Sequence, residues 1–211
     1  MIIAFLNQKG GTGKTTLSIN VAHAISSKKR NNKVLLVDAD PQGSARDWAA
    51  AREKKSLFPV IGLDRAVLHK ELPAMAKDYN HVVIDGPPRV SELARSAIMA
   101  ADLVLVPIQP SPYDVWAADE IIKLVKEASS FKQEIKCAFV VNRKIVNTAI
   151  GRDVNEALVE YEYPTLKATI HQRVIFAECA APGSTVIEMD SKGLAAEEIK
   201  KLANEILELG K

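Results

Sequence analysis

Cysteine is scarce in this chain of 211 residues. Cys137 and Cys179 stand alone, with no Cys-x-x-Cys pair and no histidine at ligand spacing. The sequence therefore argues against a zinc site and against a disulfide framework. The histidines are scattered, and each is interpreted as an ordinary surface or core residue: His23, His69, His81 and His171.

Long apolar runs and a strong excess of one charge are missing as well. No stretch approaches the roughly 18 apolar residues of a transmembrane helix, and no signal peptide precedes the first apolar run. The net charge of +2 neither indicates nor excludes a nucleic-acid partner, because such a sum can hide a small basic patch. Without a repeat or a Gly/Ser linker, we expect one cytoplasmic domain over residues 1–211, with no N-terminal helix-turn-helix domain.

Short apolar runs alternate with longer helical patterns along the chain. The runs are rich in Val, Ile and Leu, which is typical of strands covered on both faces. The order predicts an α/β fold: a mostly parallel twisted sheet with helices on both faces and ligands at the carboxyl ends of the strands. The expected strands are Ile2–Leu6, Lys33–Asp38, Tyr79–Asp85, Leu103–Pro107 and Lys136–Asn142. The expected helices are Lys14–Ser27, Ala45–Glu53, Leu68–Lys77, Val90–Ala100, Asp114–Ser129, Arg152–Tyr161 and Leu194–Leu209.

A glycine-rich run directly follows the first expected strand. Glycines allow backbone N–H groups to turn inward, and the N-terminus of the next helix adds positive potential, so the run predicts a phosphate-binding nest. Lys14 is expected to reach the outer phosphates, and Thr15 to offer its hydroxyl to Mg²⁺. The run consists of Lys9, Gly10, Gly11, Thr12, Gly13, Lys14, Thr15 and Thr16.

Two other interpretations of this run explain less of it. The usual phosphate loop has a glycine where this chain has Gln8, so the pattern here is K-G-G-x-G-K-[ST]. A plain glycine turn would not explain why a strand, the glycines, Lys14 and Thr15 coincide. A dinucleotide-binding fingerprint needs a glycine where Thr16 stands, although Asp38 lies where a ribose-binding acid belongs.

Three further motifs accompany the glycine-rich run. They are V-L-L-V-D-A-D-P-Q-G-S at 34–44, H-V-V-I-D-G-P-P at 81–88 and V-V-N-R at 140–143. Together with N-Q-K-G-G-T-G-K-T-T they resemble the deviant Walker A motif, second motif, Walker B with switch II, and adenine-side segment of the ParA/MinD ATPases. The resemblance covers essentially the whole chain, is closest to short plasmid ParA-type partition proteins, and implies a P-loop NTPase that uses ATP and Mg²⁺.

Acidic residues end two of the expected strands. Asp38 and Asp85 are expected to hold the waters of a Mg²⁺ ion that Thr15 and a phosphate oxygen bind directly. A simple turn aspartate is the alternative for Asp85, since Asp-Gly is a common turn pair. The resemblance makes Asp40 the switch I carboxylate that orients or activates the attacking water. Its alternative is a turn aspartate before Pro41.

The resemblance gives roles to four more positions. It implies that two subunits enclose two ATP molecules and that Lys9 crosses to the partner's phosphates, much as an arginine finger does. The alternative for Lys9 is a solvated loop lysine. The Gly86 N–H is expected to touch the γ-phosphate within a nucleotide-sensing segment. Asn142 and Arg143 are expected on the adenine side, although an ordinary strand-ending asparagine explains Asn142 equally well.

A ParA-type protein implies a DNA partner. The resemblance implies that the ATP-bound homodimer binds non-specific DNA on the nucleoid, and that a centromere-binding adaptor triggers slow hydrolysis and release. The C-terminal helix carries glutamates opposite its apolar stripe, so membrane anchoring is disfavoured. Candidates for the DNA surface are Lys167, Arg173, Lys192, Lys200 and Lys201, with a solvated helix face as the alternative for the last two.

Three other functions remain as alternatives. A related ATPase that positions another cargo, such as a protein complex, is compatible with the same motifs. A metabolic ligase or synthetase of this phosphate-loop class would need a second substrate pocket, for which the sequence shows no obvious constellation. A nitrogenase-type iron protein would need cysteine ligands near the nucleotide, whereas Cys137 lies in an expected strand and Cys179 is far along the chain.

Overall fold

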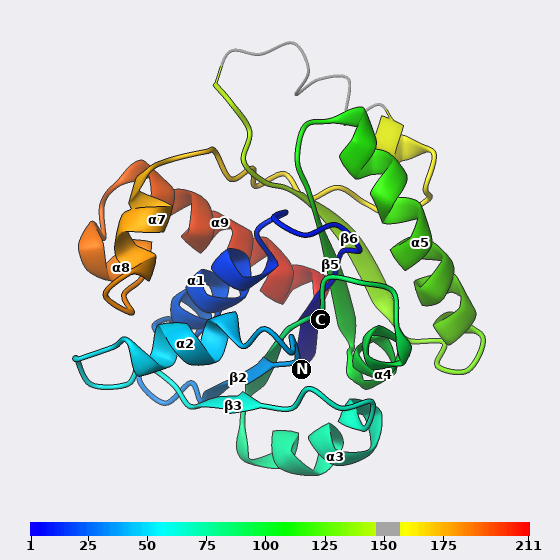
Figure 1. Ribbon diagram of the computed structural model, residues 1–211, viewed down its shortest axis with the longest axis horizontal. Coiled ribbons are helices and arrows are strands. Elements are labelled where there is room, and N and C mark those ends of the chain that lie inside the picture. Colours follow the sequence, from blue (N-terminus) through cyan, green and yellow to red (C-terminus); the bar gives the residue numbers. More distant parts are fainter. Residues whose placement is uncertain (147–156) are drawn as a thin grey trace.

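A six-stranded parallel sheet forms the centre of the molecule (Figure 1). The computed structural model describes residues 1–146 and 157–211. The strand order is β3-β2-β4-β1-β5-β6, and each neighbouring pair runs parallel. The strands are β1 Ile2–Phe5, β2 Val34–Asp38, β3 Val60–Gly62, β4 His81–Asp85, β5 Leu103–Ile108 and β6 Lys136–Val141.

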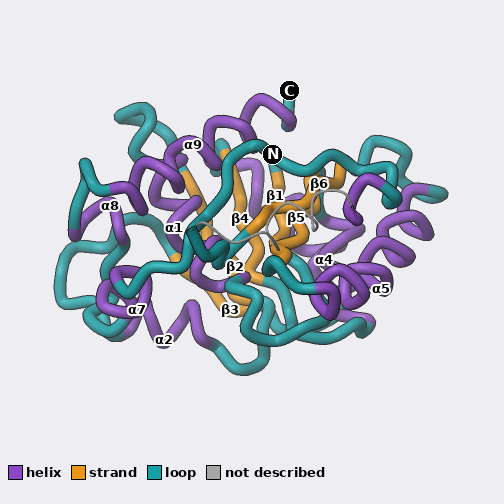
Figure 2. The backbone as a smooth tube through the Cα atoms, turned by 90° about the horizontal axis from the view of Figure 1, so that it is seen from above, coloured by secondary structure: helices purple, strands orange, loops and turns teal. Residues whose placement is uncertain are grey.

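Helices cover both faces of this sheet, as Figure 2 shows for α1 and α5. Successive side chains of a strand point to opposite faces, so Ile3 and Phe5 pack in the core beneath α1, whereas Ile2 and Ala4 pack in the core beneath α5. One layer contains α1 Lys14–Ser26, α2 Ser44–Ala50, α7 Ile175–Ala180, α8 Val186–Met189 and α9 Leu194–Leu209. The other contains α3 Leu68–Met75, the 3₁₀ helix η1 Ala76–Asp78, α4 Glu92–Ala100 and α5 Pro112–Ser129.

The register of the central strands brings three strand ends together. Asp85, the last residue of β4, pairs with Phe5 at the end of β1 and with Asp38 at the end of β2. The glycine-rich run starts at Lys9, four residues after Phe5, and leads into α1. Two carboxylates and the run therefore share one edge of the sheet, where parallel α/β proteins bind their ligands.

The predicted α/β class and the five predicted strands are confirmed. The prediction missed β3, a three-residue edge strand, and the short helices α7 and α8. It also extended α2 too far: the helix ends at Ala50, and the chain then turns at Arg52. Of the predicted helix Arg152–Tyr161, residues 152–156 lie outside the described residues, and 157–159 are helical.

Membrane-spanning helices are not found in the described part of the chain. None of its helices combines the length and the apolar character that crossing a bilayer requires.

Gly183, between α7 and α8, is a position where the fold leaves no room for a side chain. It has a φ of +61°, and an added Cβ would lie 2.6 Å from both the Arg52 nitrogen and the Trp48 oxygen. We expect Gly183→Ala to lower the free energy of unfolding by about 2–4 kcal/mol, measured by denaturant unfolding. Gly10→Ala is the matched control, because its Cβ meets nothing within 4 Å. Equal stability of the two variants would contradict the packing argument.

Candidate functional site

The glycine-rich run forms a loop of unpaired backbone donors between β1 and α1. Among the described residues, the N–H groups from Gly10 to Thr16 have no hydrogen-bond acceptor. Gly11 and Gly13 have φ values of +77° and +93°, which turn the backbone in a way that other residues rarely adopt. A row of free N–H groups at a helix N-terminus is a binding site for phosphate groups.

Side chains from other elements hold this loop in place. The Asn142 amide, 4% exposed after β6, donates to the Thr12 oxygen at 2.7 Å. A Cβ on Gly13 would lie 2.2 Å from the same amide, so the close approach requires glycine. Gln109 donates to the Gly11 oxygen at 2.9 Å. The loop is therefore shaped before any ligand binds.

Lys14 lies across the loop and points toward the acidic strand ends. It is 6% exposed, and its Nζ lies 3.4 Å from the Lys9 oxygen. Burial lowers the pKa of the Lys14 ammonium, and the charges of Asp85 and Asp40 oppose this. An anionic phosphate in the loop would favour the charged form of Lys14.

Asp85 is a fully buried carboxylate with an unused acceptor. Its Oδ1 accepts from the Ser18 hydroxyl at 3.4 Å, and its Oδ2 has no partner among the described residues. Burial raises the pKa of Asp85 to about 7, with further increases from Asp38 and Asp40 that Thr15 and Lys14 oppose. A bound cation would remove this penalty on the charged form.

Asp38 and Asp40 shape the segment between β2 and α2. Asp38 is 0% exposed; its Oδ1 accepts from the Asp40 N–H at 3.1 Å and its Oδ2 from the Arg46 N–H at 2.9 Å. Asp40 accepts from the Gln42 N–H at 2.9 Å and remains 9% exposed. Asp38 thus anchors the start of α2, and Asp40 is slightly less deeply buried in the same turn.

Lys9 is bound within its own chain. Its Nζ lies 2.6 Å from Oδ2 of Asp114 in the first turn of α5. The Lys9 side chain is 42% exposed, whereas that of Asp114 is 1% exposed, and the Asp114 Oδ1 has no partner among the described residues. The Lys9 side chain can therefore move out into solvent, but Asp114 would then remain buried without a positively charged partner.

Two residues that were expected to contact the nucleotide form hydrogen bonds within the protein in this structure. The Gly86 N–H, expected at the γ-phosphate, donates to the Phe5 oxygen at 3.1 Å, and a Cβ on Gly86 would lie 2.6 Å from that oxygen. Glycine is therefore required here by the close packing of β4 against β1. The Asn142 amide, expected at the adenine, is bonded to the loop itself, which leaves its base contact a prediction.

Next to the loop, a groove of about 880 Å³ is large enough for a nucleoside. Arg143, an exposed residue with a φ of +53°, lies at this groove beside Asn142. The wall opposite is formed by the segment before α7 and by α7 itself. The groove is lined by Thr16, Asn142, Arg143, Ile145, Val146, His171, Gln172, Arg173, Val174, Phe176, Ala177 and Ala180.

The five predicted DNA contacts do not form one cluster. Arg173 lines the groove and is paired with Glu198 at 2.7 Å, and the Lys167 N–H donates to Glu205, two turns further along the same face of α9. Lys200 instead donates to the Ser191 oxygen. The predicted set is therefore divided between two sides of α9, with Lys192 near Ser191 and Lys201 exposed.

Sequence reasoning missed the residues that hold the site from a distance. Asp114, Gln109 and Arg46 make their contacts across 105, 98 and 8 positions of sequence. Asp114 had one available signal, since an acidic residue sits in the first turn of a predicted helix, but nothing in the sequence pairs it with Lys9.

The residues present fit a nucleotide with Mg²⁺. The free N–H groups of the loop match phosphate oxygens, and the unpaired buried Oδ2 of Asp85 matches a cation or its water. No group of three or more His, Cys, Asp and Glu side chains within residues 1–146 and 157–211 could hold a metal ion alone. A Mg²⁺ site here would therefore depend on Thr15, phosphate oxygens and waters.

Neither cysteine lines the groove beside the loop. Both are buried, and burial raises the pKa of Cys137 to about 12 and that of Cys179 to about 11.

Comparisons with known proteins agree with this geometry. Residues 3–186 match the CobQ/CobB/MinD/ParA nucleotide-binding domain. The chain is 30% identical over 209 residues to the maintenance of carboxysome distribution protein A of Halothiobacillus neapolitanus, covering 97% of this chain and 95% of that protein. It is 26% identical over 251 residues to the chromosome partitioning protein ParA of Myxococcus xanthus, covering 98% and 87%.

Two solved structures share the fold. Apo McdA of Cyanthece superposes with a TM-score of 0.80 at 18% identity, covering 98% of both chains. Cobyrinic acid a,c-diamide synthase of Mycobacterium smegmatis, with a bound ATP analogue and magnesium, superposes with a TM-score of 0.79 at 20% identity, covering 98% of this chain and 93% of that one.

The buried charge of Asp85 has a measurable effect on stability. Between its ordinary pKa of 3.8 and about 7, the folded protein keeps a proton that the unfolded chain has released, so stability falls as the pH rises through this interval. We expect Asp85→Asn to stabilise the nucleotide-free protein at about pH 8, by up to about 4 kcal/mol. The difference should vanish near pH 4.

Thermal unfolding across this pH range measures the effect. Asp78→Asn is the control, because Asp78 is exposed in η1. If Asp85→Asn is less stable than the wild type at about pH 8, the buried charge of Asp85 does not destabilise the nucleotide-free protein.

Proposed function

We propose a function from the premise that this chain belongs to the CobQ/CobB/MinD/ParA nucleotide-binding family. The chain acts as one ParA-type ATPase domain: ATP joins two copies, the dimer binds non-specific DNA, and an adaptor protein stimulates slow hydrolysis and release. The proposal rests on the unpaired N–H groups from Gly10 to Thr16, which lie beside two buried carboxylates and carry the half-exposed Lys9 at their rim.

The residues of the site divide the work of phosphoryl transfer. Bound ATP with Mg²⁺ supplies the phosphoryl group and the cation that neutralises its charge. The N–H groups of the loop and Lys14 hold the phosphates, and the Thr15 hydroxyl faces the cation. Asp38 and Asp85 hold its waters. Asp40, which is held in its turn by the Gln42 N–H, orients the attacking water.

The groove next to the loop receives the nucleoside. Asn142 and Arg143 line it, and Thr16 joins it to the phosphate loop. Arg173 belongs to this groove as well, with a buried Nε that has no acceptor among the described residues. We therefore assign Arg173 to the nucleotide rather than to DNA.

Dimer formation changes the partner of Lys9. In a two-fold dimer each Lys9 would meet the partner's phosphates, and it must first leave Asp114. The gain from a charge-assisted contact with phosphate has to exceed the cost of leaving Asp114 buried without its cation. This makes dimerisation dependent on ATP and hydrolysis dependent on dimerisation.

The cargo distinguishes two candidate functions. DNA partition is the first, in which the adaptor binds a centromere. Positioning of a protein compartment is the second, favoured by the 30% identity to a carboxysome distribution protein over 97% of this chain. Measuring ATPase activity with bulk DNA and with the product of the neighbouring gene separates them, since only a centromere-binding product fits partition.

Asp40→Ala tests the catalytic assignment. We expect the variant to bind ATP and to dimerise, but to lose turnover by roughly 100-fold or more, because the attacking water is no longer oriented. Phosphate release measures turnover, and a fluorescent ATP analogue measures binding. Lys14→Ala is the comparison that should lose binding itself. Normal turnover in Asp40→Ala would remove Asp40 from this role.

Lys9→Gln tests the contact between subunits. We expect the variant to bind ATP but to remain monomeric with a non-hydrolysable analogue, because an amide cannot replace the ammonium at the phosphates. Glutamine keeps a hydrogen-bond donor for Asp114, so the fold should hold, which thermal unfolding verifies. Size-exclusion chromatography with light scattering gives the mass. Dimers equal to those of the wild type would disprove the crossing of Lys9.

A further inference from the structure

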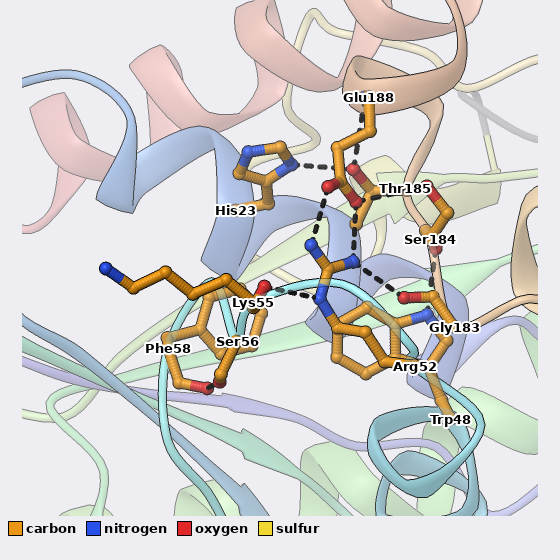
Figure 3. Close-up of polar contacts among 10 residues, drawn as sticks. All are labelled: His23, Trp48, Arg52, Lys55, Ser56, Phe58, Gly183, Ser184, Thr185 and Glu188. Atoms are coloured by element: carbon orange, nitrogen blue, oxygen red, sulfur yellow. Dashed lines mark hydrogen bonds and ion pairs between the residues drawn. The ribbon is translucent and has the colours of Figure 1, made fainter.

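A partly buried ion pair joins the turn after α2 to α8 (Figure 3). The Arg52 guanidinium, 6% exposed, makes two hydrogen bonds to Glu188, at 2.6 and 2.8 Å. It also donates to the Gly183 and Lys55 oxygens, each at 2.8 Å. The turn after α2 and the segment 183–188 are therefore fixed to each other.

The same junction includes α1. The Trp48 indole donates to the Ser184 oxygen at 2.8 Å, and the His23 Nδ1 lies 2.6 Å from the Thr185 hydroxyl (Figure 3). Val186 donates its N–H to Asn20 at 3.0 Å. Three elements that are distant in sequence thus meet at one rigid place on the surface layer.

Lysines gather around this junction. Lys54 and Lys55 are exposed in the turn that Arg52 holds. Lys200 lies close enough for its charge to act on His23, together with Arg52. Lys192 is exposed in the short connection between α8 and α9.

Two more exposed lysines lie beyond the end of α1. Lys28 and Lys29 lie in the turn that follows Ser26, the last residue of α1, and the Lys28 N–H donates to the Ile25 oxygen. In Figure 1 the loop after α1, the turn after α2 and α8 lie on the same side of the molecule.

Acidic side chains are fewer here than basic ones. Glu188 is neutralised by Arg52. Asp47, Glu53, Asp190 and Glu197 are exposed acids on the elements that meet at the junction. Lys54, Lys55 and Lys192 have no ion pair within the described ranges. A net positive surface remains, whereas on the other side of α9 the Arg173 guanidinium is paired with Glu198.

We propose that this basic face, formed by Lys28, Lys29, Lys54, Lys55, Lys192 and Lys200, binds the phosphate backbone of duplex DNA. The proposal rests on the DNA-binding function proposed above and names its surface. Duplex DNA is a rod of closely spaced negative charge, and lysines on several rigid elements neutralise its phosphates without reading the sequence.

The face suits DNA better than a lipid surface. Binding in the plane of a membrane needs an apolar helix face that is free to insert. The apolar stripe of α9 is already used in the core, since Ile199, Leu202 and Ile206 are 0% exposed. Met189 and Leu194 are exposed near Lys192, so lipid is included as an outcome of the test.

The experiment measures binding of a random-sequence duplex of about 30 base pairs by fluorescence anisotropy, with a non-hydrolysable ATP analogue. The variants are Lys54→Ala/Lys55→Ala and Lys192→Ala/Lys200→Ala. We expect each pair to weaken binding about tenfold at 0.1 M salt, and to make the slope of log K against log salt shallower by about 1 to 2. Nucleotide binding should stay unchanged.

The control removes two lysines from the opposite layer. Lys123 and Lys126 are exposed on α5, so Lys123→Ala/Lys126→Ala changes the net charge equally and should alter binding less than twofold. If the wild type binds DNA and both double variants of the basic face bind it as well as the control does, the proposed surface is wrong while the proposed function stands. If the wild type binds no DNA with any nucleotide, the function fails as well. Binding to phosphatidylserine vesicles but not to DNA, with loss in the same variants, would overturn the assignment in favour of lipid.

Discussion

The burial of carboxylates at one edge of the sheet is the constraint on which the site depends. Parallel pairing places Asp38 and Asp85 opposite each other at the ends of β2 and β4. Asp38 satisfies both oxygens with backbone N–H groups, whereas Asp85 leaves one oxygen unpaired and has its pKa raised to about 7. The fold therefore holds an unfavourable arrangement of charge that a phosphate-bound cation would relieve. Such local strain is found where a protein binds a ligand.

The loop and the acids act as complementary halves. The N–H groups from Gly10 to Thr16 present positive potential without acceptors, and the strand ends opposite present negative charge. Lys14 lies between the loop and the acidic strand ends and is largely shielded from solvent. Its positive charge therefore depends on nearby anions for stabilisation. A ligand that carries both phosphates and a divalent cation satisfies both halves at once, whereas phosphate alone would leave Asp85 unrelieved.

The sequence was sufficient for the elements whose signals are local. Continuous apolar runs predicted β1, β2, β4, β5 and β6, because strands buried on both faces need apolar residues at every position. It was insufficient for β3, which has only three residues at the sheet edge, and for α7 and α8, whose few turns are fixed by tertiary contacts such as those of Gly183 and Thr185. The loop residues of the site followed from the motif. The partners Asp114 and Arg52 did not, since an ion pair across about a hundred positions leaves no periodic trace in one sequence.

The position of α2 connects the nucleotide site to the basic face. Its first turn is bonded to Asp38 through the Arg46 N–H, and its last residues lead to Arg52, which is bonded to Glu188. A helix of seven residues spans about 10 Å and behaves as a rigid rod at this length. The carboxylate that is predicted to hold the waters of Mg²⁺ thus contacts the first turn of α2, and the turn that carries Lys54 and Lys55 follows the other end of this helix. Because both contacts are made by side chains that are themselves largely shielded from solvent, α2 physically connects the strand end at Asp38 with the turn that carries Lys54 and Lys55. Such a continuous set of contacts is the kind of connection through which a nucleotide could influence the proposed DNA surface.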